Sequence, residues 1–222
     1  MSAIDASELL RPGLLQGVSV LIAGARASRA TRTLAESVSL ACAGLGARVS
    51  ECTVGGDGFV FPIEDLDDAA VEQLVVRALT DGREVDLLAV DGAGVFAAVA
   101  EAAQAAEVEL GTRAALRVCM DVSWNVTRAV ANLAFLPNGR GGRVVYLAPA
   151  GSGGEHASAA LAGLENLART LSIEWARHGV TAVAIAPGTH SAAAREVAAL
   201  TAYLASPAGA YFSGCLLDLR GP

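Results

Sequence analysis

Short apolar runs alternate along the chain of 222 residues with segments in which apolar residues recur every three or four positions. The runs have the length and the Val, Ile, Leu and Ala content of buried strands, and the segments between them have the periodicity of helices. The predicted strands cover residues 18–23, 48–53, 59–63, 85–90, 143–148, 180–185 and 215–219. This alternation predicts an α/β fold: a Rossmann-like, doubly wound parallel sheet of about seven strands, with helices on both faces, in a single domain over residues 1–222.

Two long helices are predicted in the second half of the chain, around residues 112–136 and 158–177. Their apolar stripes consist of Val118, Val122, Val126, Ala129 and Leu133 in the first helix and of Leu161, Leu164, Ala168, Leu171 and Trp175 in the second. Gly179 follows the second helix, where a glycine commonly ends a helix because it adopts the left-handed conformation. Near the start of the chain, Thr33 and Glu36 have the spacing of a capping box, which predicts a helix that begins there.

The chain contains no lysine, since all sixteen of its basic residues are arginine. Any mechanism that needs a lysine ammonium group or a Schiff base within this chain is therefore excluded. The 23 acidic residues give a formal net charge of -7, which disfavours binding to nucleic acids and to anionic membranes. No apolar stretch is long enough to span a bilayer and no signal peptide is evident, so a cytoplasmic protein is expected.

Cysteine and histidine residues are scattered along the chain. They are Cys42, Cys52, Cys119 and Cys215, and His156, His178 and His190. The cysteines lack the paired spacing of a zinc site and are expected to be reduced thiols. The histidines have no carboxylate at ligand spacing, so no metal site is predicted.

Six segments resemble, in the same order, segments of the short-chain dehydrogenase/reductase family. They are residues 85–94 with the ending Asp91-Gly92-Ala93-Gly94, residues 125–129, 141–145 and 162–171, the Ala186-Pro187-Gly188 turn, and residues 213–218. The resemblance covers nearly the whole chain and implies the fold predicted above. It also implies an oxidoreductase ancestry and a place for an NAD(P) cofactor.

The resemblance places the cofactor against a defined set of positions. They are Gly24, Ser28, Ala30, Asp91, Ala93, Gly94, Pro187 and Gly188. The family's first turn carries three glycines that let the backbone approach a pyrophosphate, and here Ser28 and Ala30 replace two of them. The acidic residue that holds a ribose hydroxyl in the family falls near Thr53. NAD(P) binding is therefore expected to be weakened or lost, with no cofactor as the leading expectation.

The positions that match the family's catalytic residues carry no equivalent side chain. The mechanism of the family resembles general acid catalysis by a Tyr that donates the proton. A Lys lowers the pKa of that Tyr, a Ser orients the carbonyl and an Asn anchors a water relay. These positions fall on Ala157, Leu161, Pro149 and Cys119, respectively. The family's helix between its second and third strands, and the helical substrate lid after Pro187-Gly188, are also expected to be absent.

These replacements lead to the hypothesis of a degenerate family member, a catalytically inactive subunit. It would support an active short-chain dehydrogenase in a hetero-oligomeric dimer or tetramer. The contacts would involve the helices around 112–136 and 158–177 and the C-terminal strand. Trp124 and Trp175 lie on these helices, as interface anchors or as core residues.

Two alternatives stay open. The first is an NAD(P)-dependent oxidoreductase with non-standard catalytic residues, such as His156 beside the vacated Tyr position, because histidine titrates near neutral pH. Tyr146 and Tyr203 are predicted to lie on the wrong elements for this role. The second alternative is a nucleotide or acyl-CoA binding module that uses the Gly24 turn and a run of three arginines, Arg26, Arg29 and Arg32.

Overall fold

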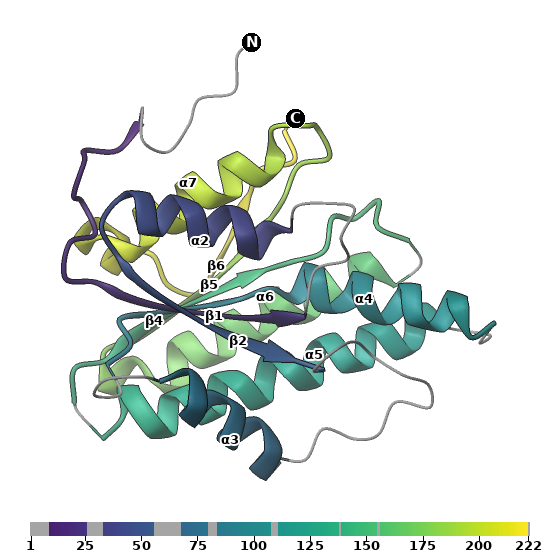
Figure 1. Cartoon of the computed structure of the whole chain (residues 1–222), viewed down its shortest axis with the longest axis horizontal. Coiled ribbons are helices and arrows are strands. Elements are labelled where there is room, and N and C mark those ends of the chain that lie inside the picture. Colours follow the sequence, from purple (N-terminus) through teal and green to yellow (C-terminus); the bar gives the residue numbers. More distant parts are fainter. Residues whose placement is uncertain are drawn as a thin grey trace.

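The computed structural model describes residues 9–25, 33–55, 68–79, 84–107, 111–137, 139–154 and 156–221. At its centre is a sheet in which all paired strands run parallel (Figure 1). The strands are β1 (Ser19–Ala25), β2 (Arg48–Val54), β3 (Leu87–Val90), β4 (Gly142–Leu147), β5 (Val180–Ala186) and β6 (Cys215–Asp218). Their order across the sheet is β2-β1-β3-β4-β5-β6.

This sheet confirms the predicted fold class and six of the predicted strands. The seventh, at residues 59–63, lies outside the described residues, as does the segment in which the family's helix was expected to be missing. β3 is buried at all four of its positions, which is the pattern of a strand covered by helices on both faces. β3 therefore appears in the sequence as a continuous apolar run, whereas β2 at the edge of the sheet alternates between polar and apolar residues.

Helices form a layer on each face of the sheet. They are α2 (Leu34–Gly44), α3 (Asp68–Ala78), α4 (Gly92–Ala105), α5 (Gly111–Val130), α6 (Ala157–Glu174) and α7 (Ala193–Ala205), with the shorter segments η1 (Ala131–Phe135), η2 (Ala176–His178) and η3 (Pro207–Tyr211). Figure 1 shows α2 and α7 side by side on one face, and α3, α5 and α6 on the other.

Alternate residues of β1 divide between two apolar cores. Val20 and Ile22 belong to the core under α2 and α7, where they are buried with Val38 of α2. Leu21 and Ala23 point to the opposite face and are buried in the core formed with α3, α4, α5 and α6. This alternation follows from the two-residue period of a strand, and it shows that β1 is covered by helices on both of its faces.

The two long helices begin and end close to their predicted limits. Four residues of the stripe on α5 are buried, whereas Leu133 lies beyond this helix, in the π-helical turn η1, and is only partly buried. Trp175 follows α6 and packs partly against the core, while Trp124 on α5 remains 41% exposed. Gly179 adopts a φ of 71° after η2, which confirms the predicted left-handed end of this helical segment.

Candidate functional site

The order in which strands are added to the sheet reverses at β1, because β2 is added on one side of β1 and β3 on the other. β1 pairs with β2 on one side and with β3 on the other, so the carboxyl ends of β1 and β3 flank a topological switch point. Ligands of open α/β sheets bind in the crevice at such a point. Gly24 stands near the end of β1 and Asp91 directly follows β3. They are so close that a methyl group at Gly24 would lie 3.0 Å from the Cβ of Asp91.

Asp91 links the first turns of two helices. Its Oδ1 accepts a hydrogen bond from the backbone N–H of Gly94 in α4 (2.9 Å), and its Oδ2 accepts one from the N–H of Ala35 in α2 (3.3 Å). Burial of Asp91 raises the pKa of its carboxyl group to about 6, while the two backbone hydrogen bonds oppose this rise and the charge of Glu36 adds to it. The carboxyl group thus holds the two sides of the crevice together.

The predicted capping box at the start of α2 is confirmed. The Thr33 hydroxyl accepts a hydrogen bond from the N–H of Glu36, and the Glu36 carboxylate accepts one from the N–H of Thr33, each at 3.1 Å. Because the N–H of Ala35 is bonded to Asp91, the first turn of α2 already donates to acceptors of its own chain. These amides are not free for a phosphate group while those bonds are in place.

The segment before this helix carries several of the sequence predictions. Ser28 and Ala30, which were predicted to match the second and third glycines of the family's turn, lie outside the described residues, as do Arg26, Arg29 and Arg32. Of the predicted cofactor positions, Gly24, Asp91, Ala93 and Gly94 gather at the switch point. Pro187 and Gly188 are buried just beyond the carboxyl end of β5.

A pocket of about 340 Å³ opens between the carboxyl ends of β1 and β2 and the start of α2. It is lined by Ile22, Gly24, Ala25, Thr33, Ala35, Glu36, Glu51, Cys52 and Thr53. Its volume falls within the range of small-molecule sites, roughly 300 to 1,000 Å³. The lining offers carboxylate and hydroxyl oxygens to a ligand that carries hydroxyl groups. The described residues therefore fit the adenosine half of a dinucleotide.

The four positions that were predicted to match the family's catalytic residues are buried. Cys119 and Ala157 are fully buried, Leu161 is 6% exposed, and Pro149 is buried two residues beyond the carboxyl end of β4. The Cys119 thiol donates a hydrogen bond to the carbonyl of Gly92 at 3.3 Å, and burial raises its pKa to about 12. A thiol held neutral in this way is not a nucleophile, so Cys119 has a packing role.

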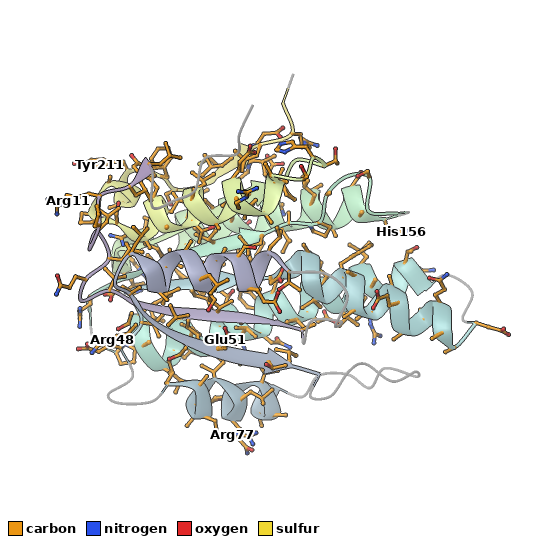
Figure 2. The ribbon with its side chains drawn as sticks, turned by 45° about the horizontal axis from the view of Figure 1, so that its top comes forward. Arg11, Arg48, Glu51, Arg77, His156 and Tyr211 are labelled. Carbon is orange, nitrogen blue, oxygen red and sulfur yellow. The ribbon has the colours of Figure 1, made fainter. Side chains whose placement is uncertain are left out.

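His156 directly precedes Ala157 and lies at the end of the molecule toward which β2 points (Figure 2). Its backbone is left-handed, with a φ of 67°. Its Nδ1 is 3.0 Å from the hydroxyl of Thr112, the second residue of α5. Residues other than glycine are uncommon in this backbone conformation, and residues held in it cluster at functional sites.

The tyrosines are placed away from this region. Tyr146 on β4 is fully buried, and its hydroxyl lies 2.9 Å from that of Thr127; burial raises the pKa of Tyr146. Tyr203 on α7 packs edge-on against Phe212. Tyr211 is 91% exposed, at the opposite end of the molecule from His156 (Figure 2). None of these three residues provides a general acid beside Ala157.

The segment after β5 passes directly into α7. Residues 187–192 are all described and form no helix between these two elements. A methyl group at Gly188 would meet the ring of His190 at 2.8 Å and the carbonyl of Leu219 at 3.0 Å. The Nε2 of His190 is 3.3 Å from the carboxylate of Glu196. The short connection agrees with the expected absence of the family's helical lid.

Sequence reasoning missed two residues of this region. Glu51 lines the pocket, but within β2 it reads only as the polar member of an alternating strand. The signal was its two-residue spacing from Thr53, which places both side chains on one face of the strand. Thr112 is remote from His156 in sequence, so only the structure brings the two together.

Neither a membrane span nor a metal site is found where the structure is described. Within that part of the chain, no helix has both the length and the apolar character needed to cross a bilayer. Among the same residues, no three His, Cys, Asp or Glu side chains gather closely enough to hold a metal ion.

A parallel sheet with the strand order β2-β1-β3-β4-β5-β6 and helices on both faces defines the Rossmann-like fold class. The chain belongs to the short-chain dehydrogenase/reductase family, since residues 16–201 match the family model described as short chain dehydrogenase.

Among curated proteins, the chain is similar to a probable 2,4-dienoyl-CoA reductase of Bacillus subtilis. The two are 26% identical over 202 residues, which cover 76% of this chain and 78% of the relative. Among solved structures, it resembles a double variant of a Serratia marcescens short-chain dehydrogenase/reductase, with a TM-score of 0.66, 19% identity and coverage of 92% and 96% of the two chains. A hydroxysteroid dehydrogenase from Escherichia coli gives a TM-score of 0.66, 16% identity and coverage of 95% and 98%.

These comparisons correct the hypothesis of an inactive subunit, which is wrong. The family is one of oxidoreductases, and the curated relative is named as a reductase, so the alternative of an NAD(P)-dependent oxidoreductase fits better. The expectation that no cofactor binds also lacks support, because this family usually binds NAD(P). Vacated catalytic positions were therefore too narrow a basis for a prediction of lost activity.

Proposed function

We propose that this protein is an NAD(P)-dependent reductase that acts on a carbon–carbon double bond conjugated to an acyl thioester. The pocket beside the switch point carries the cofactor part of the proposal, because its size and oxygen-rich lining suit an adenosine group. The substrate class is supported by the printed name of the curated relative, which aligns with most of both chains.

This reaction suits a chain without lysine and without a tyrosine beside Ala157. The nicotinamide, when bound, supplies a hydride, which adds to one carbon of the double bond. The electron pair of that bond then moves into the conjugated thioester, and a proton adds at carbon. A single proton donor, or a water molecule held by one, completes the reduction, so no alkoxide oxygen has to be protonated by a paired Tyr and Lys.

His156 is the proton donor in this proposal. In the imidazolium form that gives up a proton, Nδ1–H donates to the Thr112 hydroxyl oxygen at 3.0 Å, which orients the ring and leaves the proton on Nε2 for transfer to the substrate carbon. The residue directly precedes the position where the family carries its tyrosine, at the carboxyl side of the sheet (Figure 2). Thr112 acts on the ring of His156 and is a positioning residue.

The experiment follows oxidation of NADH and NADPH by the purified chain in the presence of a 2-enoyl-CoA or a 2,4-dienoyl-CoA. Turnover with either cofactor is expected. His156→Asn should lower kcat about 100-fold, because general acid catalysis commonly contributes a factor of this order. Asparagine is chosen because it tolerates the left-handed backbone, so the fold is retained.

The matched control is His178→Asn, in the exposed segment η2, which should leave kcat unchanged. Binding of NADH, measured by its fluorescence, should be the same in all three proteins. Absence of cofactor oxidation by the wild-type chain with every thioester would contradict the function. Equal kcat values for wild type and His156→Asn would remove His156 from the mechanism.

As a second proposal, we infer that the helices α5 and α6 bind another short-chain dehydrogenase subunit. This proposal is supported by two exposed apolar side chains on the long helices, Trp124 on α5 and Ile173 on α6, with 41% and 76% exposure. Trp is among the residues enriched in protein interfaces, and α5 and α6 pack against each other. A second copy of this chain is the simplest such partner.

Sedimentation of the purified chain should then show a dimer or a tetramer. Replacing both Trp124 and Ile173 with arginine should produce monomers, because the charges would be buried in the contact. Leu40→Arg, on the exposed side of α2, is a control that should leave the assembly unchanged. A wild-type chain that sediments as a monomer at high concentration would refute the contacts.

A further inference from the structure

The pocket between β1, β2 and α2 is negatively charged. Two carboxylates line it, Glu36 from α2 and Glu51 from β2, together with the hydroxyl-bearing residues Thr33 and Thr53. Among the described residues that line it, no side chain is basic. The acidic position of the family after its second strand falls, by the resemblance, near Thr53, which carries no charge. The negative charge of this pocket therefore comes from Glu36 and Glu51, and not from the position that carries it in the family.

Both carboxylates are held by their own chain. The Oε1 of Glu51, labelled in Figure 2, accepts a hydrogen bond from the Ser39 hydroxyl at 3.0 Å, which links β2 to α2. Glu36 is fixed by the capping box through its bond from the N–H of Thr33. Because a carboxylate has about four lone-pair sites, each of these groups keeps capacity for a hydroxyl donor.

We propose that this pocket selects NAD(H) over NADP(H), with Glu51 as the main specificity-determining residue and Glu36 as the second. The inference rests on the proposed function, since it concerns the same cofactor. A ribose that carries two hydroxyl groups can donate to the carboxylates. A 2′-phosphate at the same place would bring up to two negative charges against two fixed negative charges, with no described lining residue to neutralise them.

The test is a fluorescence titration of the purified chain with NADH and with NADPH, at low salt and without substrate. NADH is expected to bind at least about tenfold more tightly, because repulsion between such charges has this order of magnitude near a protein surface. Glu51→Gln should reduce the difference in affinity between NADH and NADPH to a few-fold. Glu51→Arg should reverse the preference, so that NADPH binds more tightly than NADH.

Glu84→Gln is the matched control. It removes the same charge at the other end of the sheet, where Glu84 pairs with Arg48 and Arg140. The NADH-to-NADPH ratio should not change in this variant. If net charge alone mattered, Glu84→Gln and Glu51→Gln would change the NADH-to-NADPH affinity ratio equally. That result would overturn the assignment of Glu51.

The possible results separate this inference from the proposed function. Equal or tighter binding of NADPH by the wild-type chain overturns the selection of NAD(H) and leaves the reductase function standing. Absence of binding for both nucleotides by a chain whose circular dichroism shows a folded protein overturns the reductase function itself. Tighter binding of NADH that Glu51→Arg leaves unchanged overturns the role of Glu51.

Discussion

Replacing Gly141 with valine is expected to remove about 4 kcal/mol or more from the free energy of unfolding, enough to unfold much of the protein at 37 °C. Gly141 has a φ of 70°, where a β-branched residue is strained. A Cβ atom at Gly141 would also lie 2.3 Å from the carbonyl oxygen of Gly179. Both atoms belong to backbone turns that lead into paired strands, β4 and β5, so neither can move alone.

Gly139→Val provides the control for this prediction. Gly139 has a similar φ of 60°, but among the described residues, apart from its neighbours in the chain, no atom lies within 4 Å of the place where its Cβ would stand. This variant should therefore show only the backbone strain, about 1–2 kcal/mol. Urea denaturation followed by circular dichroism measures both variants. Equal losses in the two would mean that the contact between Gly141 and Gly179 is not limiting.

The fold could be predicted from the sequence because its signals are local. A buried parallel strand is a continuous apolar run, as in β3, and the capping box of Thr33 and Glu36 marks the start of α2 directly. Gly179 likewise marks the end of a helical segment by its own conformational freedom. Each of these features is decided within a few residues, so no knowledge of distant contacts is needed.

The candidate site could be predicted only in part. Gly24 and Asp91 were found from the resemblance, because they stand at the ends of predicted strands. That Asp91 would cap α2 as well as α4 could not be read from the sequence, since Ala35 is 56 residues away and offers only its backbone. The same holds for Thr112 and His156, which are joined by a contact between remote segments.

The function was mispredicted for a related reason. Ala157, Leu161, Pro149 and Cys119 were compared with side chains that serve one reaction of the family. A reaction that protonates carbon places different demands on the same scaffold. Replacement of the catalytic side chains therefore excludes the mechanism that uses them. It does not show that the protein lacks every catalytic mechanism.

The pH dependence of stability should be dominated between pH 4 and pH 7 by Asp91. Burial raises the pKa of this carboxyl group to about 6 in the folded protein, from about 3.9 for an ordinary aspartate. The folded state thus binds the proton more tightly, and its stability falls as the pH rises from about 4 through about 6. The fall attributable to Asp91 is about 3 kcal/mol and is complete above that range.

Asp91→Asn should abolish this fall, because the amide does not titrate. The free energy of unfolding, measured in urea at intervals of pH, should decrease for the wild type relative to the variant by about 3 kcal/mol between pH 4 and pH 7. At pH 4 the variant should be the less stable of the two by about 1 kcal/mol, since the amide nitrogen cannot accept the second of the two backbone hydrogen bonds.

Asp218→Asn is the control variant for the pH dependence of stability, because Asp218 has a lowered pKa whereas that of Asp91 is raised. The hydrogen bonds from Arg220 lower the pKa of Asp218 to about 2, so its contribution is present above the ordinary pKa and is lost as the pH falls toward 2. Its removal should therefore leave the change between pH 4 and pH 7 as large as in the wild type. If Asp91→Asn retained the wild-type fall while Asp218→Asn abolished it, the buried carboxyl group at the switch point would not be the one that titrates. The link that it makes between α2 and α4 would then have to be independent of its charge.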